Sequence, residues 1–357
     1  MTQADGVAVR DEDAFDVDAV SRWLRENASG AEGLEGTPEV RQFSGGASNL
    51  TYQLSYPRQD LILRRPPAGT KAKGAHDMGR EYRIQAALAP VFPYVAPMVA
   101  LCEDESVIGS EFYVMERVVG HIPRKDFGVD LTTEQIRQLC TNVLDLLVAL
   151  HSVDPSTAGL DAFSKGDGYV ARQVGGWIGR FEKVKTWNVP SWAKVIAWVE
   201  ANQPADRGTG LIHNDFRLDN LVFDAADPTK PIALLDWELA TVGDPLMDLG
   251  NTVSYWIEAT DSRFLQMFRM QPSNVPGMLS RRDVVDYYCE RMGFELTDRE
   301  WAFYEVFALF RLAVILQQIY YRYHHKQTTN PKFKNYWFGS HVLHWRARQI
   351  MRSVEES

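Results

Sequence analysis

The sequence predicts an α+β fold of two lobes: a small lobe built on antiparallel β-strands and a larger, mainly helical lobe. In the first 115 residues or so, short apolar runs alternate with turns around one inserted helical pattern. After Gly120, helical periodicity dominates. A chain of 357 residues is long enough to form two such bodies. We expect residues 1–115 to form the N-terminal lobe, 116–120 a hinge and 121–357 the C-terminal lobe.

Composition excludes several classes of protein. Hydrophobic residues make up 45% of the chain and charged residues 24%, as in ordinary globular proteins. The net charge of −9 argues against non-specific nucleic-acid binding, which needs a basic surface. The three cysteines are far apart in the sequence and form no disulfide framework. The acidic N-terminus is no signal peptide, and no apolar run approaches the roughly 20 residues that span a bilayer. A cytoplasmic protein without a membrane or nucleic-acid partner is expected.

The N-terminal lobe is predicted to consist of strands with two helices. Residues 1–13 are polar, acidic and without periodicity, which predicts disorder. Prolines 90, 93 and 97 predict a linker. In chain order the predicted elements are a helix at 15–27, strands at 40–43, 50–54 and 61–64, a helix at 78–89, and a strand pair at 107–108 and 111–115.

The C-terminal lobe is predicted to be helical except for one stretch. A long amphipathic helix covers 132–152, with Thr132 or Thr133 as its N-cap. Asp244, which precedes a proline, is a second candidate cap. Further helices are predicted at 163–185, 189–202, 249–260, 280–292, 298–325 and 336–354, and short strands at 211–212, 221–223 and 232–235.

Three polar side chains lie next to the short predicted strands of the stretch 211–248. Asp215 and Asn220 are five residues apart in a polar loop between two apolar runs, and Asp236 ends a third apolar run. A polar turn is the simple interpretation, because Asn and Asp favour turns. The added Asp236 favours a functional one, since carboxylate and amide oxygens suit Mg²⁺ together with substrate phosphates. Metal-assisted phosphoryl transfer is therefore the working hypothesis.

Longer motifs in this stretch resemble a known family. HNDFRLDN, LLDWE and GDPLMDLG resemble the aminoglycoside phosphotransferases, relatives of choline kinases with a bilobal protein-kinase-like fold, and the resemblance extends from about Val40 to Trp345. It implies that Asp215 is the catalytic base and that Asn220 and Asp236 hold Mg²⁺. His213 and Asp248 are then structural supports of the catalytic loop. The chain has DWE instead of DFG and lacks an activation segment ending in APE, which argues against a protein kinase and for a small-molecule kinase.

The resemblance also implies a nucleotide site for ATP or GTP in the N-terminal lobe. A small-residue segment between two predicted strands resembles the phosphate loop of the family, although a hairpin turn alone would look the same. In the hinge, Met115 is expected against the adenine, with the Glu116 carbonyl and the Val118 amide on the base edge. The phosphate-loop candidates are Ser44, Gly45, Gly46, Ala47, Ser48 and Asn49.

The expected ion pair of the nucleotide site departs from the usual pattern. Members of this superfamily pair a strand lysine with a helix glutamate, and here the candidates are Arg64 and Glu81. Arginine can hold phosphate with two parallel hydrogen bonds. Arg65 competes for the role, but strand alternation places it on the opposite face from Arg64.

The acceptor is predicted only as a class. LILRRPP and the insertion that contains GGW near Gly175 resemble the branch of the family that occurs alone in bacteria and fused to acyl-CoA dehydrogenases in larger proteins. That resemblance implies a small metabolic acceptor with a hydroxyl group, such as a hydroxyacyl compound, in place of an aminoglycoside. The alternative is a nucleotide-binding pseudokinase with a regulatory or scaffold role, and its support is the replacement of lysine by Arg64.

Overall fold

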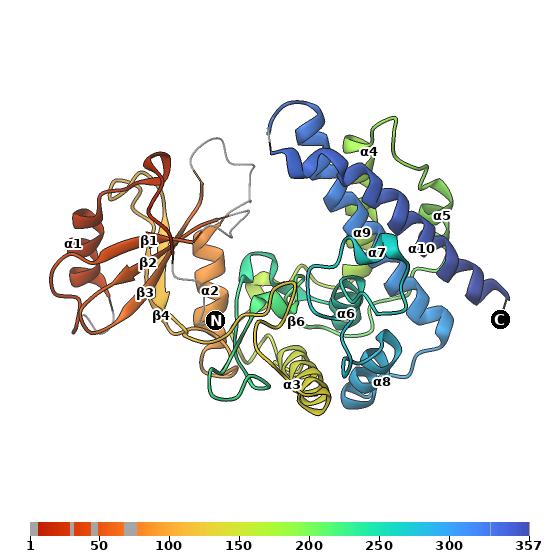
Figure 1. Ribbon diagram of the computed structural model, residues 1–357, viewed down its shortest axis with the longest axis horizontal. Helices are drawn as coiled ribbons and strands as arrows, with labels where there is room; N and C mark the ends of the chain where they lie inside the picture. The colour runs from red at the N-terminus through yellow and green to blue at the C-terminus, as the bar shows by residue number, and fades with distance from the viewer. Residues whose placement is uncertain (1–5, 29–31, 44–48, 68–76, 329, 357) are drawn as a thin grey trace. The chain divides into compact units, whose positions relative to one another are not determined.

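The computed structural model describes residues 6–28, 32–43, 49–67, 77–328 and 330–356 (Figure 1). The chain divides into two compact units. Unit 1 is Met1–Ile122 with Asn220–Ala240, and unit 2 is Pro123–Asp219 with Thr241–Ser357. The predicted α+β class is confirmed, because unit 1 holds an antiparallel sheet and unit 2 is mainly helical. The lobe boundaries stay a prediction; the units differ from them in grouping Asn220–Ala240 with the N-terminal residues.

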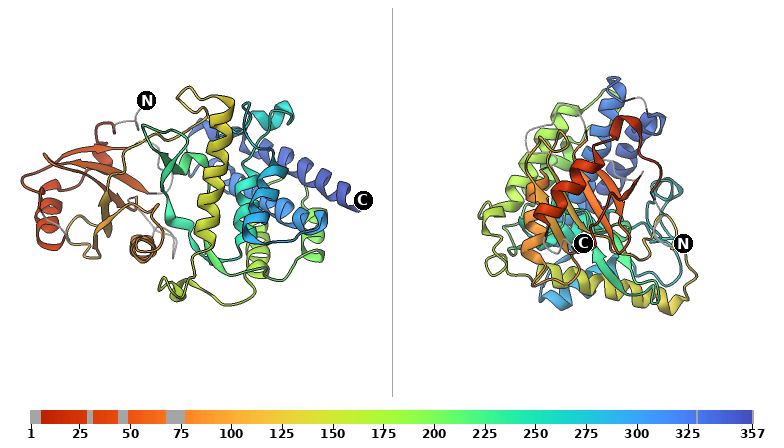
Figure 2. Two further views of the ribbon diagram at one scale, coloured as in Figure 1. Left: turned by 90° about the horizontal axis from the view of Figure 1, so that it is seen from below. Right: turned by 90° about the vertical axis from the view of Figure 1, so that its left-hand side faces the viewer.

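Unit 1 is built on a five-stranded antiparallel sheet in the order β1-β2-β3-β5-β4. Its strands are β1 (Glu39–Gln42), β2 (Leu50–Ser55), β3 (Asp60–Arg65), β4 (Met98–Cys102) and β5 (Phe112–Glu116), and its helices are α1 (Val17–Asn27) and α2 (Met78–Leu88). Successive residues of β3 point to opposite faces. Leu61 and Leu63 pack with α1, whereas Ile62 packs with Met78 of α2. Figure 2 shows α1 lying across the strands.

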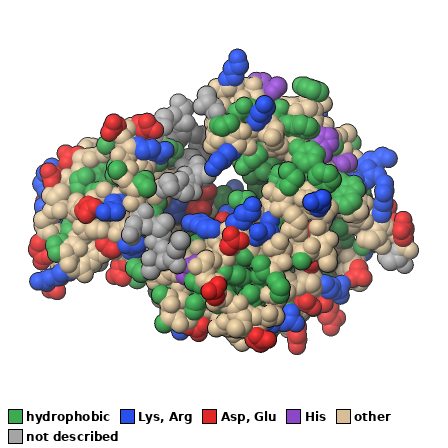
Figure 3. Space-filling view, viewed as in Figure 1, with side chains coloured by type: hydrophobic (Ala, Val, Ile, Leu, Met, Phe, Trp, Pro, Cys, Tyr) green, Lys and Arg blue, Asp and Glu red, His purple; other side chains and the backbone are tan. Residues whose placement is uncertain are grey.

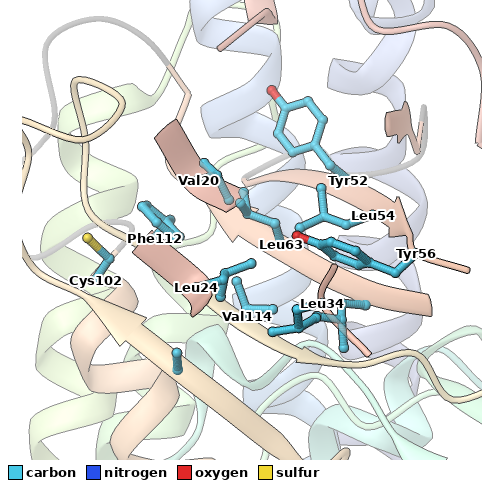
Figure 4. Packing of buried hydrophobic residues seen from close by; sticks show 12 residues of the cluster. Val20, Leu24, Leu34, Tyr52, Leu54, Tyr56, Leu63, Cys102, Phe112 and Val114 are labelled. Carbon is cyan, nitrogen blue, oxygen red and sulfur yellow. The ribbon is translucent and has the colours of Figure 1, made fainter. Parts of the chain in front are cut away.

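The main core of unit 1 lies between α1 and the sheet (Figure 4). Val20 and Leu24, four residues apart on α1, are fully buried against Leu54 and Leu63 of the strands. This i, i+4 spacing places both side chains on one helix face. Burying such aliphatic side chains contributes about 1.5–3 kcal/mol each, so α1 is held mainly by packing.

A two-stranded ribbon, β7 (Leu221–Phe223) with β8 (Pro231–Leu234), completes unit 1. The segment after β5 runs along it: the His121 and Phe223 backbones exchange two hydrogen bonds of 2.7 Å. Gly120 is required there, because a Cβ at this position would lie 2.3 Å from the Phe223 carbonyl oxygen. The ribbon is therefore fixed to the predicted hinge residues.

The predicted disorder of residues 1–13 is wrong for residues 6–13. Val7 exchanges backbone hydrogen bonds with Gln42 of β1, and a 3₁₀ helix covers Asp11–Asp13. Asp13 is buried and accepts a 2.8 Å hydrogen bond from the Gln42 side chain. Acidic composition suggested disorder, but these polar groups have partners on the edge strand. Residues 1–5 lie outside the described part of the chain.

The predicted strand at 107–108 is also wrong. The partner of β5 is β4, which starts directly after Pro97 in the region predicted as a linker. Residues 105–110 form a turn in which the Gly109 N–H donates to the Glu105 carbonyl at 2.7 Å, with Gly109 at φ +81°. Proline is excluded from strand interiors but can immediately precede a strand. Because the three prolines predicted a linker, β4 was not predicted from the sequence.

Unit 2 packs its helices around a short ribbon of β6 (Gly210–Ile212) and β9 (Thr241–Gly243). The helices are α3 (Thr133–His151), α4 (Tyr169–Val184), α5 (Ala193–Ala201), α6 (Pro245–Ser254), α7 (Arg263–Gln266), α8 (Arg281–Met292), α9 (Asp298–His324) and α10 (Tyr336–Glu356). Thr132 caps α3 in a capping box with Gln135, and Asp244 caps α6. Figure 1 shows α10 beside α9.

The helix α9 is the central helix of unit 2. It has 27 residues, and an 18-residue window reaches a mean hydropathy of 1.5, enough by length and composition to cross a membrane. The sequence analysis identified no such run. In the structure, 67% of that window is buried inside the protein, against α4, α6 and α10 among others. The apolar character of α9 therefore belongs to a core helix.

Candidate active site

A buried ion-pair cluster lies on the α2 face of the sheet in unit 1. The Arg64 guanidinium contacts Glu81 of α2 at 2.7 Å and Asp236 at 3.0 Å. The Tyr113 hydroxyl donates a 2.9 Å hydrogen bond to Glu81. Burial alone would lower the pKa of Arg64, but Tyr113 and the two carboxylates raise it well above its ordinary value. Arg64 therefore stays charged and joins β3, α2 and the segment after β8.

Arg65 lies on the opposite face and is enclosed there. Its guanidinium donates to the Asp13 carbonyl at 2.6 Å and to the Tyr52 hydroxyl, and it packs 5.2 Å from the centre of the Phe15 ring. Strand alternation has separated the two arginines as expected. Of the two, Arg64 is the one that contacts Glu81.

The end of the small-residue segment connects to the same cluster. Asn49 is buried, and its amide donates to Glu81 at 3.5 Å and to Glu238 at 3.4 Å. Arg80 of α2 donates to the backbone carbonyls of Glu238 and Ala240. The segment around Asp236 is thus held by side chains from two sides. The other candidates for the phosphate loop, Ser44, Gly45, Gly46, Ala47 and Ser48, lie outside the described residues.

Asn220 and Asp236 lie at the same end of the β7–β8 ribbon. Leu221 pairs with Leu234, and the Leu235 N–H donates to the Asn220 carbonyl at 2.8 Å. Asp236 comes next, with a positive φ of 67° that non-glycine residues seldom adopt and that is concentrated at functional sites. The ribbon therefore brings the backbone of Asn220 next to the residue before Asp236, although the two site residues are sixteen positions apart.

This pair of oxygen donors fits Mg²⁺. Among the described residues there is no group of three or more His, Cys, Asp or Glu that could hold a metal ion. Mg²⁺ needs no such cage, because it is usually bound by one or two protein carboxylates, substrate phosphates and water. The side chain of Asp236 is 37% exposed, so it can accept a further partner beside Arg64.

Of the hinge residues predicted to contact the nucleotide base, Met115 lies on the sheet face that carries Arg64 and Glu81. Glu116 and Val118 come after it in the chain. Met115 pairs with Ile62, and Tyr113 with Arg64, so all four side chains share the α2 face. Glu116 is exposed, and its backbone N–H is taken by the Pro97 carbonyl at 2.8 Å. The Glu116 carbonyl is the group that we predicted to bind the edge of the nucleotide base. Val118 is half-buried.

In unit 2, a buried carboxylate holds the loop that follows β6. Asp248 of α6 accepts the backbone N–H groups of His213 and Asn214 at 2.7 and 2.8 Å, and it lies 3.1 Å from the His151 ring. Burial raises the pKa of Asp248, but the hydrogen bonds and charges of His151 and His213 outweigh it, so the pKa is lowered. His213 is fully buried and packs edge-on against Phe216.

Asp215 lies in that loop, within a network of ion pairs that the sequence analysis missed. Arg217 forms ion pairs of 3.3 Å with both Asp215 and Asp219, and its guanidinium stacks 4.8 Å from the centre of the Tyr255 ring. The pKa of Asp219 is raised, mainly by burial. Arg217 lowers it and Asp215 raises it further, but burial is the largest effect. The two extra charges within HNDFRLDN were a visible signal, whereas nothing in the spacing indicated His151 or Tyr255.

Comparison with known proteins assigns the class. The model of the "Phosphotransferase enzyme family", APH, matches residues 39–283, and the chain belongs to this family. A solved structure from Ralstonia eutropha, assigned to the aminoglycoside phosphotransferases, shares 29% of the sequence with a TM-score of 0.80, covering 95% of this chain and 99% of that one. The predicted bilobal, protein-kinase-like fold is confirmed by this likeness.

Two longer relatives each contain a segment that is similar to this chain. Acyl-CoA dehydrogenase family member 10 of Mus musculus is 35% identical over 319 residues, 88% of this chain and 29% of that protein. Family member 11 from the same species is 34% identical, over 90% of this chain and 41% of that protein. The chain therefore spans less than half the length of these relatives. A fold neighbour with a TM-score of 0.55 and 15% identity, covering 95% of this chain and all of its own, is an aminoglycoside phosphotransferase in ternary complex with AMP-PNP and hygromycin B.

Proposed function

We propose that the chain is an ATP-dependent, Mg²⁺-requiring kinase that phosphorylates a hydroxyl group of a small metabolic acceptor. The observation that carries the proposal is the bridge of Arg64 between Glu81 and Asp236, with Asn220 beside Asp236 on the ribbon. Kinases of this fold need a cation on the third strand, its glutamate on the following helix and a pair of metal ligands. All four residues belong to unit 1, where Arg64 contacts Glu81 and Asp236.

The nucleotide is proposed to bind on the α2 face. Arg64 would donate to phosphate oxygens while Glu81 and Tyr113 hold its orientation. Backbone N–H groups of Ser44–Asn49 would take the remaining phosphates, and Met115 would pack on the base. The AMP-PNP complex of the fold neighbour supports a nucleoside triphosphate as donor. We propose ATP in preference to GTP, because ATP is the more general donor in phosphoryl transfer.

Asn220 and Asp236 would hold the metal ion through their side-chain oxygens. The bound ion neutralises charge on the transferring phosphate. Arg64 and the metal ion would both attract Asp236, so the exposed part of this carboxylate is the part available to the ion.

Asp215 is proposed as the base. It lies five residues before Asn220 in the HNDFRLDN motif. The Asp215 carboxylate accepts the proton of the acceptor hydroxyl as that oxygen bonds to the γ-phosphorus. The bond from the γ-phosphorus to the bridging oxygen breaks, and ADP leaves. Arg217 holds the Asp215 carboxylate in place through an ion pair of 3.3 Å.

The charge beside Asp215 does not select the acceptor, because Arg217 is paired with both Asp215 and Asp219. Similarity to acyl-CoA dehydrogenase family members 10 and 11 supports a hydroxyacyl compound. The free, separated cysteines and the buried α9 suit a cytoplasmic enzyme.

Substitution of Asp215 by Asn tests the proposal. We expect the Asp215→Asn variant to lose about 10²–10⁴-fold in kcat, the usual contribution of a general base, while its Kd for Mg-ATP changes less than about threefold. The measurement is ATP-dependent mass gain over a panel of hydroxylated metabolites. Asp145→Asn is the matched control, since Asp145 also pairs with an arginine in unit 2, at 3.2 Å.

The pseudokinase alternative gives a different result. Such a protein would bind Mg-ATP but transfer phosphate to no member of a broad hydroxyl panel, and Asp215→Asn would change nothing. The intact set of Asp215, Asn220 and Asp236 argues against it.

A further inference from the structure

Unit 2 contains an apolar pocket that the proposed chemistry does not use. Its volume is about 490 Å³, within the usual range for small-molecule sites. Leu312 and Leu316, one turn apart on α9, form part of its wall. Figure 3 shows hydrophobic side chains gathered over α7 and the neighbouring helices. The remaining apolar lining is Tyr255, Ile257, Leu265, Met267, Phe268, Met270, Tyr336, Trp337, Phe338 and Leu343.

The pocket is lined by residues that contact the loop of the proposed base. Tyr255 stacks on Arg217, and Met270 lies 3.9 Å from the same guanidinium through its sulfur atom. The next residue, Gln271, accepts a 3.1 Å hydrogen bond from the Leu218 N–H and donates to the Tyr255 carbonyl. A ligand that contacts Tyr255 or Met270 is therefore separated from Asp215 by that side chain and by Arg217.

The pocket is open to solvent in spite of its apolar wall. Met267 is 71% exposed and Met270 54% exposed. Methionine side chains are flexible and adapt to apolar ligands of varied shape. Its polar lining is cationic: Arg269 and Lys332 are the charged residues among those that form it. An apolar wall with cations beside it fits a molecule with a hydrocarbon chain and an anionic end.

We infer that this pocket is the chain-binding subsite of the acceptor, which is an amphipathic hydroxyacyl compound with an anionic end. The inference rests on the proposed kinase activity and deepens it. The hydrocarbon chain lies against Leu312, Leu316 and Phe268, and the anionic end lies near Lys332. Arg217 then separates the apolar pocket from the reacting hydroxyl.

Binding measurements with the Asp215→Asn variant test the subsite without requiring turnover. The probes are hydroxyacyl carboxylates and their coenzyme A thioesters, with the hydroxyl position fixed and the terminal alkyl chain lengthened from two to eight carbons. Calorimetry is expected to show tighter binding by about fourfold for each added methylene until the pocket is full, the change that burial of one CH₂ gives. The heat capacity change should become more negative along the series.

Two variants locate the effect. Leu316→Phe fills the pocket and is expected to weaken binding of the longest probe at least about tenfold while sparing the shortest. Leu131→Phe is the matched control, because Leu131 lines a different cavity of about 560 Å³ in the same unit, and it should leave the series unchanged. Lys332→Gln should weaken the anionic probes but not a neutral amide of equal length. The two series of probes show whether a carboxylate or a thioester is the anionic end.

The outcomes separate this inference from the kinase proposal. Affinity independent of chain length, or equal effects of Leu316→Phe and Leu131→Phe, would overturn the subsite even if phosphate transfer is found. A dimer in sedimentation that Leu316→Phe dissociates would also overturn it, since a second copy would then occupy the pocket. Chain-length-dependent binding without transfer to any probe would support the subsite and count against the kinase proposal.

Discussion

At the scale of single residues, Arg64 distinguishes this chain from kinases that carry a lysine at the same place. An ammonium group is a compact charge, whereas a guanidinium offers a planar set of donors. Arg64 uses that geometry to contact Glu81 and Asp236 through different nitrogens. The sequence analysis treated the arginine as the main reason to consider a degenerate site. In the structure it links three segments of unit 1.

We expect Arg64→Lys to fold but to bind nucleotide less tightly. A lysine reaches one carboxylate, so at least one charge-assisted hydrogen bond is lost, about 1.5–3 kcal/mol or roughly 10–100-fold in the Kd for Mg-ATP. Isothermal titration measures this Kd, and chemical denaturation measures the free energy of unfolding.

The neighbouring arginine provides the control for that substitution. Arg65→Lys makes the same chemical change on the opposite face, where Arg65 contacts Asp13 and Tyr52. It should lower the free energy of unfolding and leave the nucleotide Kd within about twofold. Equal effects of both substitutions on the Kd would show that Arg64 has no special role.

At the scale of elements, local patterns predicted most helices and strands because their signals lie within a few residues. The cap of α3 and the apolar i, i+4 face of α1 are such signals. The strand β4 was not predicted, because its assignment depends on pairing with β5 and prolines precede it in the sequence.

The site residues also divide into those with a local signal in the sequence and those without one. Asp215 and Asp236 follow strands and Asn220 directly precedes one, so all three could be singled out. His151, in contrast, reaches Asp248 from a helix 97 residues away. The roles of these residues stay predictions.

The ribbon β7–β8 depends on Gly120. Gly120→Ala would place a methyl group 2.3 Å from the Phe223 carbonyl oxygen and 2.6 Å from Val222, so the backbone must shift. We expect a loss of about 1–3 kcal/mol in the free energy of unfolding, as for overpacked cores. Weaker Mg-ATP binding should accompany it, since Asn220 directly precedes this ribbon.

Gly179→Ala is the matched control for this effect. Gly179 lies inside α4, and a Cβ there meets no atom within 4 Å. The alanine variant should be more stable by about 0.5–1 kcal/mol, because glycine in a helix interior has a high entropic cost. A Gly120→Ala protein as stable as the wild type would mean that the ribbon can move away from the hinge segment.

At the scale of the whole molecule, the chain is a phosphotransferase-family body that its longer relatives carry as one part. Net charge and composition predicted an ordinary globular protein. They could not predict that Asn220–Ala240 belong to the same unit as the N-terminal residues. That grouping results from strand pairing and from the backbone hydrogen bonds of His121 and Tyr94 with the ribbon. Long-range pairing of this kind leaves no local pattern.

Thermal unfolding of the full chain tests the metal ligands. At 100 times its Kd, a non-hydrolysable ATP analogue with Mg²⁺ should stabilise the protein by about 2.7 kcal/mol through mass action. We expect Asp236→Asn to lose the part of this stabilisation that depends on Mg²⁺, and chelation of the metal should do the same to the wild type. Asp60→Asn is the control, since Asp60 pairs with Arg117 at 2.8 Å and is 33% exposed, close to the 37% of Asp236. A Mg²⁺-dependent stabilisation that survives in Asp236→Asn would remove this residue from the metal site.

The guanidinium of Arg64 also has a chemical consequence. Lysine amines are acylated and methylated, both by enzymes and by reactive acyl donors, and a kinase that depends on one lysine can be inactivated in this way. A guanidinium remains protonated at every physiological pH and is a poor nucleophile. With the acceptor and the nucleotide site that we propose, this contact would stay unmodified among activated acyl groups, and lysine-directed acylating reagents should leave this position of the protein unlabelled.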